Sequence, residues 1–283
     1  MTKKSYKMQW QQAVPAPSTI TTKARAFLRN SILSFSSVIS RGQSDTYLRC
    51  LYCHYVFDNQ RDDFEKLIIN LKKIGQFIDT DECIEMLKGN KEIDDRYFHL
   101  SFDDGFRNNF TNTFPILKKH NVHAIFFVPS LLIEDDWDST KNYCMNTNNY
   151  RAVIEMMVWK ELKELLMEGY EIGSHTKTHA RFTEISHSEE MMEDEILGSK
   201  TDLEANLNYN CKYIAWPYGK LADADSKSLK MVKDAGYSAC FGAYRGSVDP
   251  GAMNIFRIPR HHFEVHWPIS HIEYFARGNM EVK

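Results

Sequence analysis

Two adjacent carboxylates, Asp103 and Asp104, lie between an apolar run and Gly105. The run, Tyr97 to Phe102, is predicted to be a strand. Neighbouring carboxylates repel each other unless a cation or a proton lies between them, so this pair predicts a bound metal ion at a strand end. The other Asp-Asp pairs have surroundings typical of caps, turns and solvated loops: Asp62-Asp63, Asp94-Asp95 and Asp135-Asp136.

Two histidines, His175 and His179, follow a second apolar run, Tyr170 to Gly173. Imidazoles four residues apart can bind one ion when the turn between them is helical. The spacing alone is not specific, because the chain has eleven histidines and His262 and His266 repeat it. The position after a predicted strand favours His175 and His179. Three others are interpreted as surface or core histidines: His120, His123 and His187.

A third segment ends an apolar run, Tyr213 to Trp216, in the turn Pro217-Tyr218-Gly219. The sequence is typical of a structural turn, but a backbone N–H beyond Pro217 can also donate to an oxyanion. Aromatic side chains near these motifs either stack on sugar rings or pack at the rim of the fold: Phe106, Trp216 and Tyr218.

The elements that position these residues repeat a pattern of helix, glycine and strand. Helix-period apolar residues precede Gly75, Gly169 and Gly236, and a strand-like run follows each glycine. This order is typical of a parallel sheet. The remaining predicted strands are Leu48 to Val56, Tyr97 to Phe102, Ala124 to Val128, Tyr213 to Trp216 and Phe256 to Pro259. Seven or eight strands favour a distorted (β/α) barrel, with an open doubly wound sheet as the alternative.

A polar stretch between Leu131 and Tyr150 interrupts this rhythm and is longer than most connections. We interpret it as a surface insertion, with a lid over the site as the alternative. No glycine-rich nucleotide-binding motif follows any predicted strand.

The three motifs resemble those of the polysaccharide deacetylases, the NodB-homology group of carbohydrate esterases. The stretch 101–105, Ser-Phe-Asp-Asp-Gly, resembles the first motif of that family. His175 to His179 matches the second motif, and Ala215 to Gly219 is similar to the third. Weaker likeness extends from about Leu48 to Phe275. The resemblance implies a distorted (β/α) barrel of seven or eight parallel strands, with a divalent metal at its open end.

The resemblance also implies roles for individual residues. Asp104, His175 and His179 would hold the metal, and Asp103 would be the base that deprotonates the attacking water. The backbone N–H of Tyr218, in the turn with Pro217 and Trp216, would stabilise the oxyanion. Zn²⁺ is the first choice for two histidines and a carboxylate, while Co²⁺, Ni²⁺ or Fe²⁺ would also fit.

Two departures from the family pattern concern the groups around the base. The family often has an arginine two residues before the proline of the third motif, where this chain has Ala215. Its Asp-x-x-Asp-Trp partner motif is absent around residues 240–244. Arg260 is the candidate to orient Asp103 instead. The general acid would be one of three histidines: His261, His262 and His266. His262 is preferred, because it would share a strand face with Arg260.

Composition excludes several classes of protein. A chain of 283 residues forms one large domain or two small ones. A net charge of −3 argues against a nucleic-acid binder, and no apolar run reaches the ~18 residues of a membrane span. Six cysteines contain one C-x-x-C pair, Cys50 and Cys53, and are interpreted as buried, reduced thiols.

We expect residues 1–45 to be an N-terminal extension and residues 46–283 to be the deacetylase domain. The extension lacks the apolar core of a signal peptide, which favours a cytoplasmic location. Its segment 24–40 is interpreted as a helix packed on the domain, with weak peripheral membrane contact as the alternative.

The expected function is metal-dependent removal of an N-acetyl group from an N-acetylated sugar or polysaccharide intermediate. Cytoplasmic location would point to an intermediate of surface-polysaccharide assembly. The alternatives are a non-catalytic carbohydrate-binding protein on the same scaffold and a metal-dependent amidohydrolase acting on a non-sugar amide.

Overall fold

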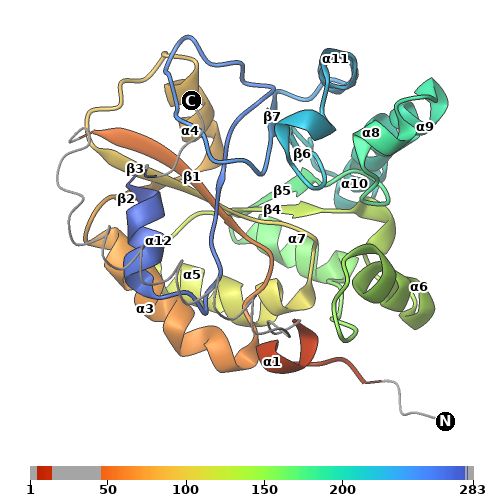
Figure 1. Ribbon diagram of the computed structural model, residues 1–283, viewed down its shortest axis with the longest axis horizontal. Coiled ribbons are helices and arrows are strands. Elements are labelled where there is room, and N and C mark those ends of the chain that lie inside the picture. Colours follow the sequence, from red (N-terminus) through yellow and green to blue (C-terminus); the bar gives the residue numbers. More distant parts are fainter. Residues whose placement is uncertain (1–4, 15–45, 278, 280–283) are drawn as a thin grey trace, which may run out of the picture.

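Eight parallel strands form one curled sheet in the computed structural model, which describes residues 5–14, 46–277 and 279 (Figure 1). The strands are β1 (Tyr47–Cys53), β2 (Gln76–Ile78), β3 (Arg96–Phe102), β4 (Ile125–Val128), β5 (Glu171–Ser174), β6 (Tyr213–Ala215), β7 (Ala239–Phe241) and β8 (His261–His262). The prediction of a strand at Phe256 to Pro259 is wrong in position. Only Ile258 forms a bridge there, with Phe241, and the last strand begins at His261. Pro259 has no N–H to donate to a strand ladder, so the strand begins only after it.

The strand order is β7-β6-β5-β4-β3-β1-β8, with β2 beside the first half of β3. Because Ile258 bridges Phe241 three residues before β8 begins, the two ends of this order approach each other. The sheet is therefore a distorted barrel, as predicted. All the strands run parallel, so their carboxyl ends meet at one rim, and residues that follow different strands come together there.

Helices cover the outside of the sheet (Figure 1). The α-helices are α1 (Trp10–Ala13), α3 (Arg61–Lys72), α4 (Thr80–Leu87), α5 (Phe114–His120), α6 (Trp137–Asn142), α7 (Trp159–Met167), α8 (Phe182–Ile185), α9 (Glu189–Glu193), α10 (Ser199–Leu207), α11 (Ser226–Asp234) and α12 (Ile269–Ala276). Short 3₁₀ turns are η1 (Asp58–Gln60), η3 (Ser130–Leu132) and η6 (Leu221–Asp223), and π turns are η2 (Asn109–Thr113), η4 (Tyr143–Thr147) and η5 (Asp194–Gly198).

Alternating side chains of the strands build two cores. In β4, Phe126 packs outward with the helices, whereas Ile125 and Phe127 point into the barrel. The inner core also contains Ile84 and Leu87 of α4. Helix α4 therefore closes the barrel at the amino ends of the strands, and the opposite rim is left for a site.

The predicted helix ends agree with the structure where glycine is required. Gly169 and Gly236 follow α7 and α11 with φ of 83° and 82°, a left-handed conformation that glycine adopts without steric cost. The apolar residues that predicted α3, among them Phe64 and Leu71, are buried against the outer face of the sheet.

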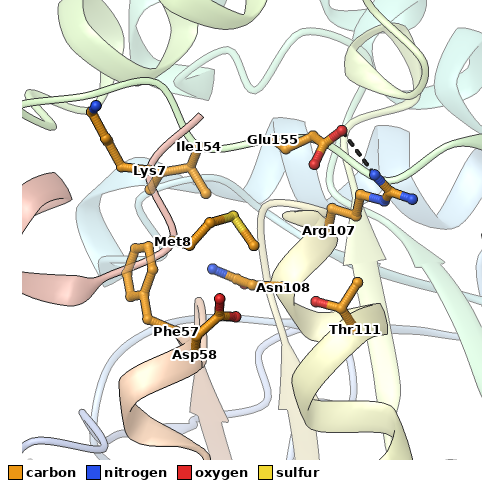
Figure 2. A pocket seen from close by; sticks show the side chains of 9 residues that line it. All are labelled: Lys7, Met8, Phe57, Asp58, Arg107, Asn108, Thr111, Ile154 and Glu155. Atoms are coloured by element: carbon orange, nitrogen blue, oxygen red, sulfur yellow. Dashed lines mark hydrogen bonds and ion pairs between the residues drawn. The ribbon is translucent and has the colours of Figure 1, made fainter. Parts of the chain in front are cut away.

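The described N-terminal residues lie across the rim of the barrel. Ala13 is buried, and the ring of Trp10 stacks on His266 with a centroid separation of 4.3 Å. Lys7 and Met8 cover a small pocket in which the amide of buried Asn108 has no hydrogen-bond partner among the described residues (Figure 2). Residues 15–45 lie outside the described residues, so the packed helix and the membrane contact expected at residues 24–40 stay predictions. Among the described helices, none is long and apolar enough to cross a membrane.

Candidate active site

Three buried side chains converge at the open rim of the barrel. Asp104 follows β3, and His175 and His179 follow β5. Asp104 Oδ1 lies 3.6 Å from His175 Nε2 and 3.4 Å from His179 Nε2. Strands β3 and β5 both pair with β4, which brings these residues together although more than 70 positions separate them. The structure thus groups the three residues that were predicted to hold a metal.

The backbone around these side chains is unusual. Four residues of the site that are not glycine have left-handed φ values: Asp104 (73°), Thr176 (62°), His179 (67°) and Tyr218 (61°). They are half of the eight such residues in the described chain, and three of the remaining four are asparagine, which tolerates this conformation. Such backbone strain costs about 1–3 kcal/mol per residue. Strained residues are found most often at functional sites, where the unusual conformation is needed to place a side chain.

Hydrogen bonds fix the orientation of His175 and anchor the loop that leads to His179. His175 Nδ1 donates to the carbonyl oxygen of Ala215 at 2.7 Å, which leaves Nε2 directed at Asp104. The loop between the histidines is held by the buried carboxylate of Glu195, which accepts from the amides of Lys177 and Thr178 at 3.1 and 3.0 Å. An imidazole oriented in this way presents one nitrogen to an ion.

The three side chains fit a divalent metal ion. Bonds of ~2.1 Å at tetrahedral angles separate the ligand atoms by about 3.4 Å, close to the two separations observed. Asp104 Oδ1 is buried and has no hydrogen-bond partner among the described residues. Burial raises the pKa of Asp104, but His179 and the other nearby imidazoles outweigh it and hold the pKa well below its usual range. Burial also lowers the pKa of His175 to about 4, so its ring is neutral at pH 7.

Asp103 is held by Arg260, as the sequence suggested. The guanidinium donates to both carboxylate oxygens, at 2.7 and 2.8 Å, and also to Ser101 Oγ at 3.0 Å. Arg260 is fully buried and lies against the rings of Tyr52 and Phe127. Burial raises the pKa of Asp103, but the charge of Arg260 outweighs it and lowers the pKa below its usual value. Asp103 is therefore an oriented, ionised carboxylate.

The turn after β6 places Tyr218 beside the site. Its ring lies 5.1 Å from the ring of His179, and the Arg181 guanidinium covers it at 3.9 Å. Among the described residues, the amide of Tyr218 donates to no hydrogen-bond acceptor, which leaves it free to bind an oxyanion. The turn is tight because the Gly219 carbonyl accepts from the Ala243 amide at 2.7 Å.

Trp216 is not exposed for sugar stacking. Its side chain is buried, packs against Gly242 and donates from Nε1 to the Lys220 carbonyl at 3.2 Å. Phe106 is also fully buried. Rim packing is thus the correct interpretation for these two rings, and among the three aromatic candidates only Tyr218 keeps a partly accessible side chain.

The predicted histidines at the C-terminal side occupy different places. His261 is buried, His266 stacks on Trp10, and His262 Nε2 lies 3.2 Å from Glu264 Oε1. The ring of His262 is 5.2 Å from that of His54, which follows β1 directly. His266 Nδ1 also lies 4.0 Å from Glu264 Oε2, but His262 is the candidate whose ring contacts that of His54.

Sequence reasoning missed His54. Its charge, like that of His175, lowers the pKa of both Asp103 and Asp104. The ligand atoms of His54, His262 and Glu264 lie within 4.8 Å of one another. The predicted strand, Leu48 to Val56, contained His54, whereas β1 ends at Cys53, so the sequence did not mark His54 as a strand-end residue.

The polar stretch 131–150 is more than a surface insertion. Its π turn η4 carries Tyr143, a buried residue whose ring lies 5.4 Å from the ring of His179. Burial and the charge of Asp104 raise the pKa of Tyr143 well above its usual value, so the phenol stays protonated. The stretch therefore forms one wall of the site.

The family model described as Polysaccharide deacetylase matches residues 90–240 of this chain, which is more than half of its length. The chain belongs to the polysaccharide deacetylase family. It is 28% identical over 168 residues to the poly-β-1,6-N-acetyl-D-glucosamine N-deacetylase of Staphylococcus aureus (strain MRSA252), covering 57% of this chain and 52% of that one. The chain thus spans about half the length of the curated relatives it matches.

Solved structures show the same fold. The structure of IcaB from Ammonifex degensii aligns with a TM-score of 0.69 at 20% identity, covering 83% of this chain and 98% of that one. The Streptococcus pyogenes deacetylase PplD, solved in complex with acetate, aligns with a TM-score of 0.64 at 19% identity, covering 82% and 98%. At these identities the likeness concerns the architecture, and the chemistry must be argued from the side chains of this chain.

Proposed function

We propose that this deacetylase is a metal-dependent hydrolase that removes N-acetyl groups from an N-acetylated polysaccharide. One observation carries the proposal: an ionised carboxylate, Asp103, is fixed by Arg260 beside three side chains spaced as metal ligands. Amide hydrolysis needs both parts, since the attacking water must lose a proton and the carbonyl oxygen must gain charge.

Asp104, His175 and His179 would hold the ion, for which Zn²⁺ is the first choice. When bound, it would polarise the amide carbonyl and acidify the attacking water. Asp103 accepts the proton of that water, and the pair of bonds from Arg260 prevents the carboxylate from turning away. The Tyr218 amide donates to the developing oxyanion.

A proton must reach the departing amine, and we assign its delivery to His54. His54 follows β1 directly, and its charge, like that of His175, lowers the pKa of both carboxylates. His175 is a proposed metal ligand, which leaves His54 as the donor, and the ring of His262, itself in contact with Glu264, lies 5.2 Å from that of His54. His262, preferred from the sequence, then becomes the residue that positions His54 and supplies its proton. Comparing the pH profiles of the His54→Gln and His262→Gln variants separates the two assignments, because only loss of the donor itself removes the alkaline limb.

The substrate we propose is a polymer that contains N-acetylglucosamine. The named activity of the Staphylococcus aureus relative supports this choice. The cytoplasmic location expected from the sequence stays a prediction, and with it the choice between a finished polymer and an assembly intermediate.

The test measures acetate release and bound metal in two variants with matched controls. Asp103→Asn should lower turnover by about 10²–10⁴-fold, the usual contribution of a general base, and keep the metal. His175→Ala should lose both turnover and metal. The controls are Asp62→Asn, in an exposed Asp-Asp pair, and His187→Ala, an exposed histidine. Full acetate release by Asp103→Asn would disprove the mechanism.

Arg260 weakens the alternative of a non-catalytic carbohydrate-binding protein. That alternative rested on the missing arginine at Ala215, but Arg260 contacts the base directly. Carbohydrate binding with no turnover under any divalent ion would still favour it. Release of acetate from simple acetamides but not from N-acetylated sugars would favour the non-sugar amidohydrolase.

A further inference from the structure

A second group of soft metal-binding side chains lies inside the barrel, toward the end closed by α4. Cys50 comes from β1, Cys83 from α4 and His99 from β3, and their ligand atoms lie within 4.8 Å of one another. All three side chains are buried. Cys50 and His99 are paired across neighbouring strands, so the sheet register itself sets them side by side.

The separation of the two sulfurs suits shared coordination. Cys50 Sγ and Cys83 Sγ are 3.7 Å apart. Two thiolates bound to one zinc ion at ~2.3 Å and tetrahedral angles would be about 3.8 Å apart. A disulfide requires a sulfur separation of about 2.05 Å. The pair is thus spaced for a common ion and not for a covalent bond.

His99 is oriented as a third ligand. Its Nε2 lies 3.1 Å from the hydroxyl of buried Thr80, and its ring stacks on Phe241 with centroids 5.4 Å apart. Its Nδ1 is buried and has no hydrogen-bond partner among the described residues. A histidine that binds a metal characteristically uses one ring nitrogen for the ion and the other for a hydrogen bond. Thr80 supplies that second contact.

The net charge of the ion and its ligands determines which ion this buried group could bind. Apolar side chains, among them Leu48, Ile84 and Phe127, surround the group, so an unbalanced charge there would be costly. A divalent ion with two thiolates and a neutral imidazole has no net charge. The hydrogen bond from Cys83 and the nearby His99 lower the pKa of Cys50, which favours the first thiolate.

We propose that Cys50, Cys83 and His99 bind one thiophilic divalent ion, Zn²⁺ for choice, at a site separate from the open rim. Both thiols lose their protons to solvent when the ion binds, and the ion ties α4 to β1 and β3. Its role is structural, because the donors are buried beneath the layer formed by Arg260 and Phe127. This site does not depend on the proposed function, since no residue is shared.

The test counts metal in a protein whose rim site has been removed. The His175→Ala variant should keep about one equivalent of Zn²⁺ by elemental analysis, and wild type should hold about two. Adding Cys83→Ser should remove the remaining equivalent. Adding Cys53→Ser instead should leave this equivalent bound, because Cys53 lies in β1 like Cys50 but its buried thiol faces the outer core. Cobalt-loaded wild type should show thiolate-to-cobalt charge-transfer absorption that Cys50→Ser lacks.

Three results would overturn the proposal. The first is a His175→Ala protein that holds no metal after incubation with Zn²⁺ and with Co²⁺. The second is full retention of the second equivalent in Cys83→Ser. The third is a Cys50–Cys83 disulfide in protein purified without reductant. If the serine variants do not fold, the absorption spectrum of cobalt-loaded wild type is the test. Absence of the thiolate-to-cobalt band would contradict the proposed site.

Discussion

The open and closed ends of this barrel each bring together three candidate metal ligands, but on very different backbones. At the open end, Asp104 and His179 lie in loops with left-handed φ values, next to the buried charges of Asp103 and Arg260. At the closed end, Cys50 and His99 lie in regular strands and Cys83 in a helix, within an apolar core.

The difference follows from what each end must do. A catalytic group has to point at a substrate, which regular strands cannot arrange because their side chains face only inward or outward. Loops at strand ends can, at a cost in backbone strain. A structural group needs only to sit between elements that are already packed. We therefore expect substitutions at the open end to trade stability against activity, and those at the closed end to change stability alone.

The largest effect is expected from breaking the buried pair at the open end. Arg260→Met leaves the Asp103 carboxylate buried without a partner, and this should lower the free energy of unfolding by about 3–5 kcal/mol. Adding Asp103→Leu should recover much of that loss, since an apolar pair of similar volume is tolerated. Urea unfolding of both single variants and the double variant measures the coupling. Additive effects would mean that the pair is not coupled in the folded protein.

A smaller effect should appear in the loop that carries His179. Glu195→Ala removes the carboxylate that holds the amides of Lys177 and Thr178, so metal affinity at the rim should fall by about 10–100-fold. Competition with a chelator measures this affinity. Glu193→Ala, an exposed residue two positions away, is the matched control. Equal affinities in the two variants would show that the loop needs no anchor.

A substitution between the two ends should disturb both. A methyl group added at Gly173 would lie 2.4 Å from the ring of Phe127, which packs against Arg260 and against Phe241, the ring that covers His99. Gly173→Ala should therefore cost about 1–3 kcal/mol of stability through overpacking. Thermal unfolding checks it, with Gly169→Ala as a strained but uncrowded comparison. A stability equal to wild type would mean that Phe127 moves freely.

The smallest effect is expected at the wall of the open end. Tyr143→Phe removes a hydroxyl beside Asp104 but keeps the ring that packs on His179. We expect turnover to fall by less than about tenfold and stability to change by about 1 kcal/mol or less, since the buried Tyr143 hydroxyl has no hydrogen-bond partner among the described residues. Steady-state kinetics and thermal unfolding measure both. A complete loss of turnover would give Tyr143 a direct part in the reaction.

Sequence patterns were sufficient for the architecture and for the three residues that meet as candidate metal ligands at the rim. Apolar periodicity and three glycines predicted parallel strands, and parallel strands bring their carboxyl ends to one edge. Asp104, His175 and His179 each stand just beyond a strand, so their convergence follows from local signals. His54 obeys the same rule but was missed because the first strand was predicted to extend to Val56, whereas β1 ends at Cys53.

What the tertiary structure alone decided is which distant residues face each other inside the barrel. Arg260 could be suggested from the sequence, but its two hydrogen bonds to Asp103 span 157 positions. The burial of Trp216, the approach of Tyr143 to His179 and the grouping of Cys50 with Cys83 likewise have no local signal. Strand register and barrel closure determine these contacts, and both come from packing over the whole chain. Local patterns determine which elements form, whereas the closed sheet determines which side chains meet.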